Sequence, residues 1–500
     1  MAGGIADIRR LFAEVAGNVL HGCASPLHGE PGGRVGRLPP CFVLASTGEH
    51  VTGISKGWAG LRSGIWGACL AAVSLGAQAE GLTHAFAHAL EQDPTWAEAQ
   101  ARYAEVLADR DLARAGYHPV LNIAGRVTAN HREVVGDYFG LQDINRSDDF
   151  EAFGYSIQLR QPILRLDRWR QRDAASLRVA AASARLNAAE VDLMIRVVEA
   201  YFAALDAEQD LELAKAELRS ITDRATQVSE QADLEIATEL ARSEANAQRD
   251  LARARVLLSE QQLQTRRAEL ALITGEPGME LSALRTYGHV PHLATTDQDA
   301  WVDQARASNP LLVATRLESE VASRGVDIER AARLPTLDLV AQRDYIDNSG
   351  GVSGEREDSE DVIGLELRLP LYDGGATRAR TSAALARYEQ ALARQARAQR
   401  EAEFQATSAY SAVELGQEQI GALRSARSAT YDAVEATEGG VFAGTRTEVD
   451  LMQALRERFD AERGLTRAVH AYLLNSLRLK AAAGTLGADD LMAVNRLLAD

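Results

Sequence analysis

The sequence predicts an α+β chain built from two copies of one plan, each with long helices and a pair of strands. Three observations lead to this fold class. Landmarks recur in the same order in both halves of the chain, short segments alternate apolar and polar residues, and residues 163–274 include neither Gly nor Pro. Aromatic residues are only 5% of the 500 residues and charged residues are 25%. This composition is typical of long helices packed through narrow seams rather than around one large core.

Residues 1–79 are expected to be a leader and signal peptide outside the fold. Within them, residues 66–79 form an apolar stretch that ends in Ala-Gln-Ala and follows Lys56 and Arg62. A basic region, an apolar region and a small-residue cleavage site occur in this order in secretory signals, although a buried Ala-rich helix is an alternative. All three cysteines lie in this leader. Residues 1–55 are rich in Gly and Pro without periodicity, which indicates a start site assigned too early.

The two copies are expected at residues 80–290 and 291–484, with a tail at 485–500. Internal repeats are sought first because they decide the whole fold. Four paired landmarks recur in order: Asp-Pro at 93–94 and Asn-Pro at 309–310, prolines at 119 and 335, alternating segments ending near 162 and 370, and related helical sequences from 198 and 407. Four matches in one order indicate a duplication.

Each copy is expected to start with a helix that opens after its Asp-Pro or Asn-Pro pair, because proline is well placed in the first helical turn. Pro119 and Pro335 end these helices because proline cannot continue a helix. A strand pair follows at about 119–162 in the first copy and about 335–370 in the second, with polar loops NRSDDFEA and SGGVSGEREDSED between the strands. The strict alternation predicts strands, and its apolar members are Phe153, Tyr155, Ile157, Leu159, Ile363, Leu365, Leu367 and Leu369.

Long helices are predicted next, at about 163–274 and about 376–483. Apolar residues recur three and four positions apart with charges between them, which is the helical period. At about 1.5 Å per residue, residues 163–229 alone would reach about 100 Å, so these helices need partners along their length. In the second copy we expect a break at the Glu-Gly-Gly of 438–440 and a new helix from Thr447.

The strand pairs pose a physical problem, because four strands cannot close a barrel and hydrocarbon does not tolerate unpaired sheet edges. Three chains would supply twelve strands, so we expect a trimeric 12-stranded barrel with apolar residues toward outer-membrane lipid and polar residues toward the lumen. The charged helices would continue the barrel as a helical coiled-coil tube, which makes the assembly a conduit. The expected lumen residues are Ser156, Gln158, Arg160, Glu366 and Arg368.

With these features the chain resembles the TolC family of outer-membrane channels, which serve type I secretion and drug efflux. The resemblance covers about residues 82–492, and its most specific segment is VFAGTRTEVDLMQA at 441–454. It implies a trimer in the outer membrane of a Gram-negative bacterium, with the helical part in the periplasm. It also implies an entrance closed by coiled helices, and as partners an inner-membrane ABC-type transporter and a periplasmic adaptor.

The same resemblance implies roles for residues at the entrance. Arg446 matches an arginine that tethers the closed helices, and Asp450 matches an aspartate that lines the pore as a threefold ring. Phe442 stands where a tethering tyrosine would be, and Gln453 stands where a second aspartate ring would be. The candidates for the partner turn in the first copy are Thr238 and Glu239.

No enzyme, cofactor or metal site is expected. Residues 53–57 fit the G-x-S-x-G hydrolase motif but lie in the leader, without the strand-turn-helix setting that the motif needs. The pairs His84/His88 and His289/His292 have spacings that a metal could use, yet no third ligand is evident, so we interpret them as a helix face and a loop. The net charge of −17 disfavours nucleic acid as a partner.

The sequence therefore favours an outer-membrane channel subunit for type I protein secretion, with secreted proteins as cargo. Glu80 follows the expected cleavage site, where the dedicated efflux branch commonly has a lipid-bearing cysteine. Small-molecule efflux remains an open alternative. A periplasmic coiled-coil adaptor or scaffold without a barrel is a more distant one, because it would not need two strand pairs.

Overall fold

The computed structural model describes residues 81–138, 141–283, 297–350 and 354–498. All described elements belong to one unit, Gly76–Asp500. The predicted leader and the His289/His292 pair lie outside the described residues.

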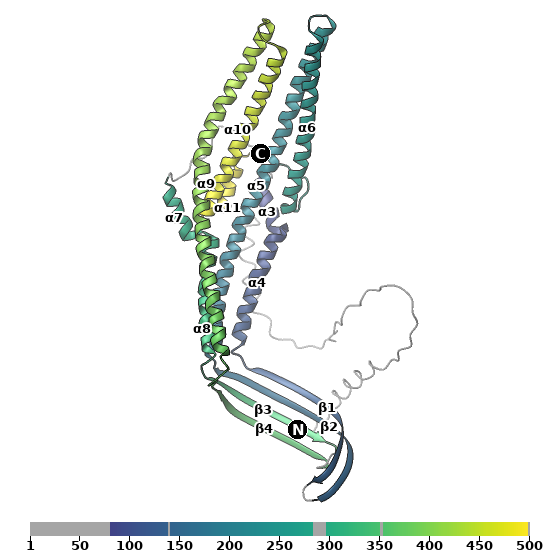
Figure 1. Cartoon of the computed structure of the whole chain (residues 1–500), viewed down its shortest axis with the longest axis vertical. Coiled ribbons are helices and arrows are strands. Elements are labelled where there is room, and N and C mark those ends of the chain that lie inside the picture. The colour runs from purple at the N-terminus through teal and green to yellow at the C-terminus, as the bar shows by residue number, and fades with distance from the viewer. Residues whose placement is uncertain (1–80, 139–140, 284–296, 351–353, 499–500) are drawn as a thin grey trace, which may run out of the picture. The chain divides into compact units, whose positions relative to one another are not determined.

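The two halves of the chain repeat the same order of elements: two helices, two strands and two long helices (Figure 1). The first half contains α3 (Leu82–Gln92), α4 (Pro94–Ala115), β1 (Val120–Tyr138), β2 (Leu141–Leu164), α5 (Leu166–Asp233) and α6 (Glu239–Thr274). The second half contains α7 (Gln298–Ser308), α8 (Pro310–Ala331), β3 (Thr336–Asn348), β4 (Arg356–Arg368), α9 (Ala376–Phe442) and α10 (Glu448–Ala482), and α11 (Ala488–Asn495) follows. The predicted α+β fold class is confirmed.

The Asp-Pro pair of the first half begins α4 as expected. The Asp93 carboxylate accepts a hydrogen bond from the backbone N–H of Trp96 at 3.1 Å, and Pro94 occupies the first helical turn. Burial raises the pKa of Asp93, but the hydrogen bond and charge of Arg196 outweigh it and hold the pKa below its usual value. This ion pair of 2.8 Å also fixes the start of α4 to the long helix α5.

The Asn-Pro pair of the second half has the same double role. The Asn309 side-chain oxygen accepts from the backbone N–H of Leu312 at 3.1 Å and so caps α8. Its amide group donates to the carbonyl of Ala482 at 3.0 Å. Each pair therefore starts a helix and docks it on another one.

The four strands form one antiparallel sheet in the order β1-β2-β3-β4 (Figure 1). The strands are longer than predicted. The segment NRSDDFEA lies inside β2, and the end of the second expected loop lies inside β4. Polar residues are compatible with these parts of the strands because they pair across neighbouring strands, such as His131–Asp149 at 2.6 Å and Arg343–Asp361 at 3.6 Å.

The break predicted at residues 438–440 is wrong by a few residues. Gly439 and Gly440 remain helical, and α9 continues to Phe442. A glycine inside a helix costs only about 1 kcal/mol, so two glycines do not by themselves end a helix of this length. The helix ends where the chain adopts the left-handed conformation, at Gly444 with φ of 73°, which is the usual glycine signal for a helix C-terminus.

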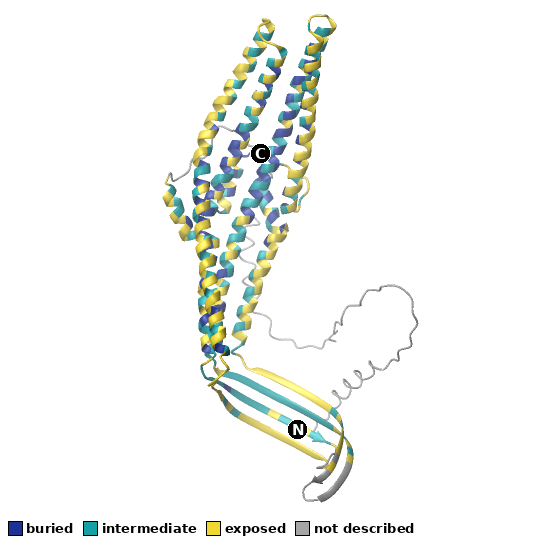
Figure 2. Ribbon diagram, in the orientation of Figure 1, coloured by how far each residue is buried: buried dark blue, intermediate teal, exposed yellow. Residues whose placement is uncertain are grey.

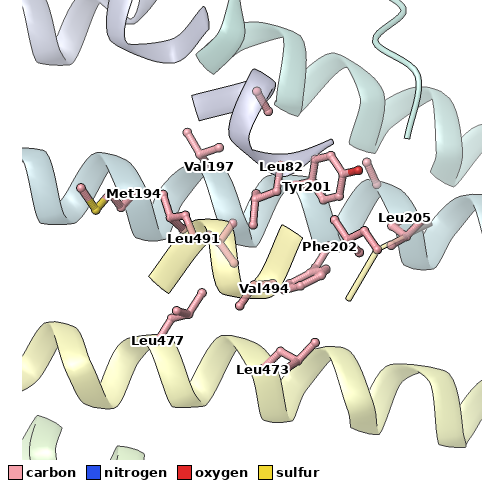
Figure 3. Close-up of a cluster of buried hydrophobic side chains, with 14 of the residues drawn as sticks. Leu82, Met194, Val197, Tyr201, Phe202, Leu205, Leu473, Leu477, Leu491 and Val494 are labelled. Atoms are coloured by element: carbon pink, nitrogen blue, oxygen red, sulfur yellow. The ribbon is translucent and has the colours of Figure 1, made fainter. Parts of the chain in front are cut away.

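The largest hydrophobic cluster among the described residues is formed mainly by α3, α5, α10 and α11, with further members on α4, α6 and α9. Figure 2 shows buried residues along α5 and α10, and Figure 3 shows their side chains meeting those of α3 and α11. Residues that contribute from these four helices are Leu82, Val197, Tyr201, Phe202, Leu473, Leu477, Leu491 and Val494. None of the helices in the described parts of the chain is long and apolar enough to cross a membrane.

A polar seam continues the contact between α5 and α10. Glu217 on α5 is only 1% exposed, and its carboxylate binds two guanidinium groups. Arg463 on α10 donates to Oε2 at 2.6 Å, and Arg255 on α6 donates to Oε1. Three helices therefore meet at one carboxylate. Further pairs between α5 and α10 are Asp210–Arg467, Asp206–His470 and Glu199–Arg478.

We expect Glu217→Gln to destabilise the helical region strongly. Removing one partner of a buried ion pair costs up to about 3–5 kcal/mol. Arg463 has little access to water here and would keep only Asp460 as an ion-pair partner. Chemical denaturation followed by circular dichroism measures this loss. Glu212→Gln is the matched control, since Glu212 lies on the same helix in an exposed pair with Lys215. Equal losses in both variants would contradict a special role for Glu217.

Candidate pore entrance and lumen

The turn between α9 and α10 carries the most specific sequence motif of the chain. Gly444 adopts positive φ, and the backbone N–H groups of Thr445 and Arg446 both donate to the carbonyl of Gly440, at 2.9 and 3.2 Å. Thr447 then begins α10 as its N-cap. The motif is thus a compact turn closed by backbone hydrogen bonds.

Asp450 and Thr447 form a reciprocal cap at the start of α10. The Thr447 hydroxyl accepts from the backbone N–H of Asp450 at 3.2 Å, and the Asp450 carboxylate accepts from the backbone N–H of Thr447 at 2.9 Å. These hydrogen bonds lower the pKa of Asp450, and the charge of Arg446 lowers it further. The predicted pore residue is therefore an ionised helix cap at neutral pH.

The turn between α5 and α6 uses the same hydrogen bonds. The Gln231 carbonyl accepts from the backbone N–H groups of Ile236 and Ala237, at 2.8 and 3.1 Å. Glu235 has a positive φ of 59°, at the place where the second turn has its glycine. The two hairpin turns are therefore equivalent in backbone structure.

Both residues proposed for the first turn lie at the start of α6. The Thr238 hydroxyl caps the helix by accepting from the backbone N–H of Ala241 at 3.1 Å. Glu239 lies in the first helical turn and pairs with Arg242 at 3.1 Å. Thr238 and Glu239 occupy the positions in this turn that Thr447 and Glu448 occupy in the turn between α9 and α10.

Phe442 and Arg446 are exposed on either side of the second turn. Phe442 ends α9 with 96% of its surface accessible. A Cβ atom on Gly440 would lie 2.7 Å from Cγ of Arg446, so the glycine gives the arginine side chain room to lie against α9. An aromatic ring with this exposure is suited to contact a surface outside this chain.

Gln453 lies on α10 one turn after Asp450. Its amide group donates to Glu457 at 3.2 Å, one further turn along the helix. The opposite face of α10 buries Leu451 and Met452. Because residues three and four apart share a helix face, Asp450, Gln453 and Glu457 form one polar stripe. Glu457 was not predicted, although its spacing from Gln453 was a usable signal.

Arg224 links the two hairpins close to their turns, and the sequence did not reveal it. Its guanidinium lies 3.2 Å from Glu438 on α9 and 3.3 Å from Glu448 in the first turn of α10. The Arg224 side chain is only 16% exposed, so water screens these contacts less than at an open surface. No sequence spacing joins these distant positions.

The sheet register places all five predicted lumen residues on one face. Directly paired residues of an antiparallel sheet share a face, and residues two apart on a strand do so too. The relevant pairs are Ser156–Asp344, Gln158–Gln342, Arg160–Val340, Asp338–Glu366 and Thr336–Arg368.

An ionic network occupies this polar face. Arg160 contacts Asp338 at 3.4 Å and Glu366 at 3.3 Å, while Arg165 contacts Asp338 at 3.5 Å. Asp338 is only 5% exposed and connects Arg160 of β2 with Arg165, the N-cap residue of α5. Asp338 was not predicted as a lumen residue, although it occupies a polar position of the alternation in β3.

The opposite face of the sheet is open and apolar over residues 121–127 of β1 and 363–367 of β4, whereas the pairs His131–Asp149 and Arg343–Asp361 lie further along the same face. Tyr155 and Tyr345 are paired across β2 and β3 and stack at 5.1 Å. Exposed residues on this face are Leu121, Ile123, Val127, Ile363, Leu365 and Leu367. An apolar surface of this extent marks contact with a membrane or a partner.

A sheet with one polar, ion-paired face and one open, largely apolar face, in one chain with long helical hairpins, fits an outer-membrane channel protein. The family described as outer membrane efflux protein matches residues 86–276 and 301–485. The chain belongs to this family, and the match falls once on each half. It is a transport protein of the outer membrane rather than an enzyme.

Similar proteins agree with this assignment. The outer membrane protein TolC of Vibrio cholerae is 29% identical over 477 residues, covering 92% of this chain and 98% of that relative. The alkaline protease secretion protein AprF of Pseudomonas aeruginosa is 27% identical, covering 87% and 90%. The structure of the Campylobacter jejuni CmeC outer membrane channel aligns with a TM-score of 0.69 at 13% identity, covering 83% and 89%, which shows the same fold.

We expect an arginine on the apolar face of the sheet to impair membrane assembly and an arginine on the polar face to be tolerated. Ile363→Arg and Val362→Arg make the same change at neighbouring positions of β4 that face opposite ways. An arginine toward the bilayer midplane costs about 2–4 kcal/mol, and lumen positions do not carry this cost. Heat-modifiable migration and outer-membrane yield measure assembly. Equal tolerance of both variants would contradict the two-faced sheet.

Proposed function

We propose that three copies of this chain form one conduit for type I protein secretion across the outer membrane. In this proposal it works with an inner-membrane ABC-type transporter and a periplasmic adaptor. The trimer rests on one observation. Within the described residues, β1 pairs only with β2 and β4 pairs only with β3, so the sheet has two free edges. Edges cannot remain unpaired in hydrocarbon, and three four-stranded sheets closed edge to edge give twelve strands.

The polar face of the sheet would then line the lumen. Its network around Asp338 combines arginines with Asp338 and Glu366, so the lining is charged but nearly balanced in this region. Such a lining is suited to hydrated cargo, since it presents ion pairs to water rather than an apolar wall.

The hairpin turns would form the periplasmic entrance. Three copies of the stripe of Asp450, Gln453 and Glu457 would face one another there, with Asp450 as the constriction. Arg446 and Phe442 are exposed and would contact the neighbouring chain in the closed state. Arg224 would hold the second hairpin to α5 within each chain, because it binds both α9 and α10.

Protein secretion is supported by the similarity to AprF, which is named as an alkaline protease secretion protein and aligns along most of both chains. Small-molecule efflux is the second candidate, favoured by the description of the family. An adaptor without a barrel does not fit, because the four-stranded sheet with its open apolar face would have no use there.

Deletion of this chain in its own bacterium separates the two candidates. We expect the deletion to remove secreted proteins from the culture medium while susceptibility to drugs and detergents stays unchanged. Expression of the chain from a plasmid should restore secretion. A rise in drug susceptibility with an unchanged set of secreted proteins would support efflux and contradict the proposal.

Asp450→Asn should reduce block of single-channel current by multivalent cations added at the periplasmic side. Asparagine keeps a side-chain oxygen that can accept from Thr447, so the helix cap persists while the charge is lost. A ring of like charges in a narrow, low-dielectric entrance concentrates cations strongly. Asp489→Asn is the control, since Asp489 is an exposed acid in the first turn of α11. Unchanged block in Asp450→Asn would place the constriction elsewhere.

A further inference from the structure

We propose that His84, His88 and Glu276 form a binding site for a divalent transition metal such as zinc. The two histidines lie on α3, and Glu276 lies in the turn that follows α6. A third ligand for the histidine pair was not evident from the sequence, because Glu276 is far away along the chain. The fold brings the carboxylate to the histidines.

The positions of the side chains fit a single ion. His84 and His88 share a helix face, and their ring centroids lie 4.5 Å apart. Nε2 of His88 lies 3.7 Å from Oε2 of Glu276, and one candidate ligand atom from each residue lies within 4.8 Å of the others. Tetrahedral zinc with bonds of about 2.0–2.1 Å holds its ligand atoms about 3.3 Å apart. Binding one ion would require side-chain rotations that bring the three ligand atoms from within 4.8 Å of one another to this spacing.

Two of the polar atoms at this place have no hydrogen-bond partner among the described residues. Nδ1 of His84 and Oε2 of Glu276 are both buried and unsatisfied. Buried polar atoms nearly always have a partner in a native fold, so two such atoms at one place need an explanation. A metal ion that accepts an electron pair from each side chain supplies one.

The backbone holds Glu276 in place. Gly275 ends α6 in the left-handed conformation with φ of 73°, and a Cβ atom there would lie 2.9 Å from Cβ of Gln92. Only glycine therefore allows the turn to approach the end of α3 so closely. The hydroxyl of Thr274, a fully buried residue, accepts from the backbone N–H of Glu276 at 3.4 Å.

Both halves of the site are anchored in the same core. Leu82 and Ala85 on α3, and Leu270 and Met279 around the turn after α6, belong to the largest hydrophobic cluster. Rigid supports of this kind keep ligands near a productive geometry. The bound ion would tie the start of α3 to the end of α6.

The donor set selects the class of metal. Imidazole nitrogen suits zinc, copper and nickel, whereas magnesium and calcium prefer oxygen ligands alone. Three protein ligands leave a fourth position for water. The side chains of His88 and Glu276 are 37% and 42% exposed, so an ion can enter from solvent and exchange.

Zinc titration of the purified full chain tests the site. The affinity tag is removed, the protein is dialysed against a chelator, and Zn²⁺ is added in competition with a chromogenic chelator. We expect one Zn²⁺ per chain. Loss of even an outer partner of a metal ligand weakens binding 10- to 100-fold, so His84→Ala and Glu276→Gln should each weaken it by about 100-fold or more.

His131→Ala is the matched control, because His131 pairs with Asp149 on the sheet and should leave zinc binding unchanged. A Cys23→Ser, Cys41→Ser, Cys69→Ser chain excludes thiols as the ligands. Co²⁺ gives a second readout, as visible absorption bands of a nitrogen- and oxygen-ligated ion that Glu276→Gln removes. Zinc affinity that is equal in the unmodified chain, His84→Ala and Glu276→Gln overturns the proposal.

Discussion

The contact between α5 and α10 at Glu217 is the constraint on which the arrangement of the hairpins depends. Helices as charged as these cannot bury a wide apolar face, so part of the seam is polar. A buried carboxylate is costly unless hydrogen bonds and opposite charges satisfy it, and here Arg463 and Arg255 do so from two other helices. Sliding α10 by one turn would break this triad. The triad therefore fixes the register of both hairpins, and with it the height of their turns.

The two hairpin turns, one in each half of the chain, have the same backbone hydrogen bonds but different side chains. Both turns close through two N–H groups that donate to one carbonyl, and both begin the next helix with a threonine cap. The second turn has Arg446 and Asp450 where the first has Ala237 and Ala241. The shared backbone plan makes the hairpins similar, while the charges of Arg446 and Asp450 have no counterpart at the same positions of the first turn.

Local signals in the sequence predicted most of the fold, and long-range contacts account for what it missed. Pro94 and the alternation in β4 act on their own segments, so their effects could be predicted. The continuation of α9 through Gly439, and of β2 through its polar end, depends on partners that only the folded chain supplies. Arg224 and Glu276 gain their roles from residues far away in sequence. Asp338 lies between these two cases: the sequence shows that it occupies a polar position of β3, but it does not show that the side chain is buried.

The hydrogen bonds that cap α10 at Asp450 would help a ring of three Asp450 carboxylates to stay ionised. Three carboxylates brought together repel one another, which raises their pKa values and favours protonation. The hydrogen bonds with Thr447 act in the opposite direction, because they stabilise the ionised form, and the neighbouring charge of Arg446 adds to them. In the proposed trimer each aspartate would bring this stabilisation with it from its own chain. The same Thr447–Asp450 hydrogen bonds would then serve two roles: they start α10, and they keep the Asp450 carboxylate ionised in the pore.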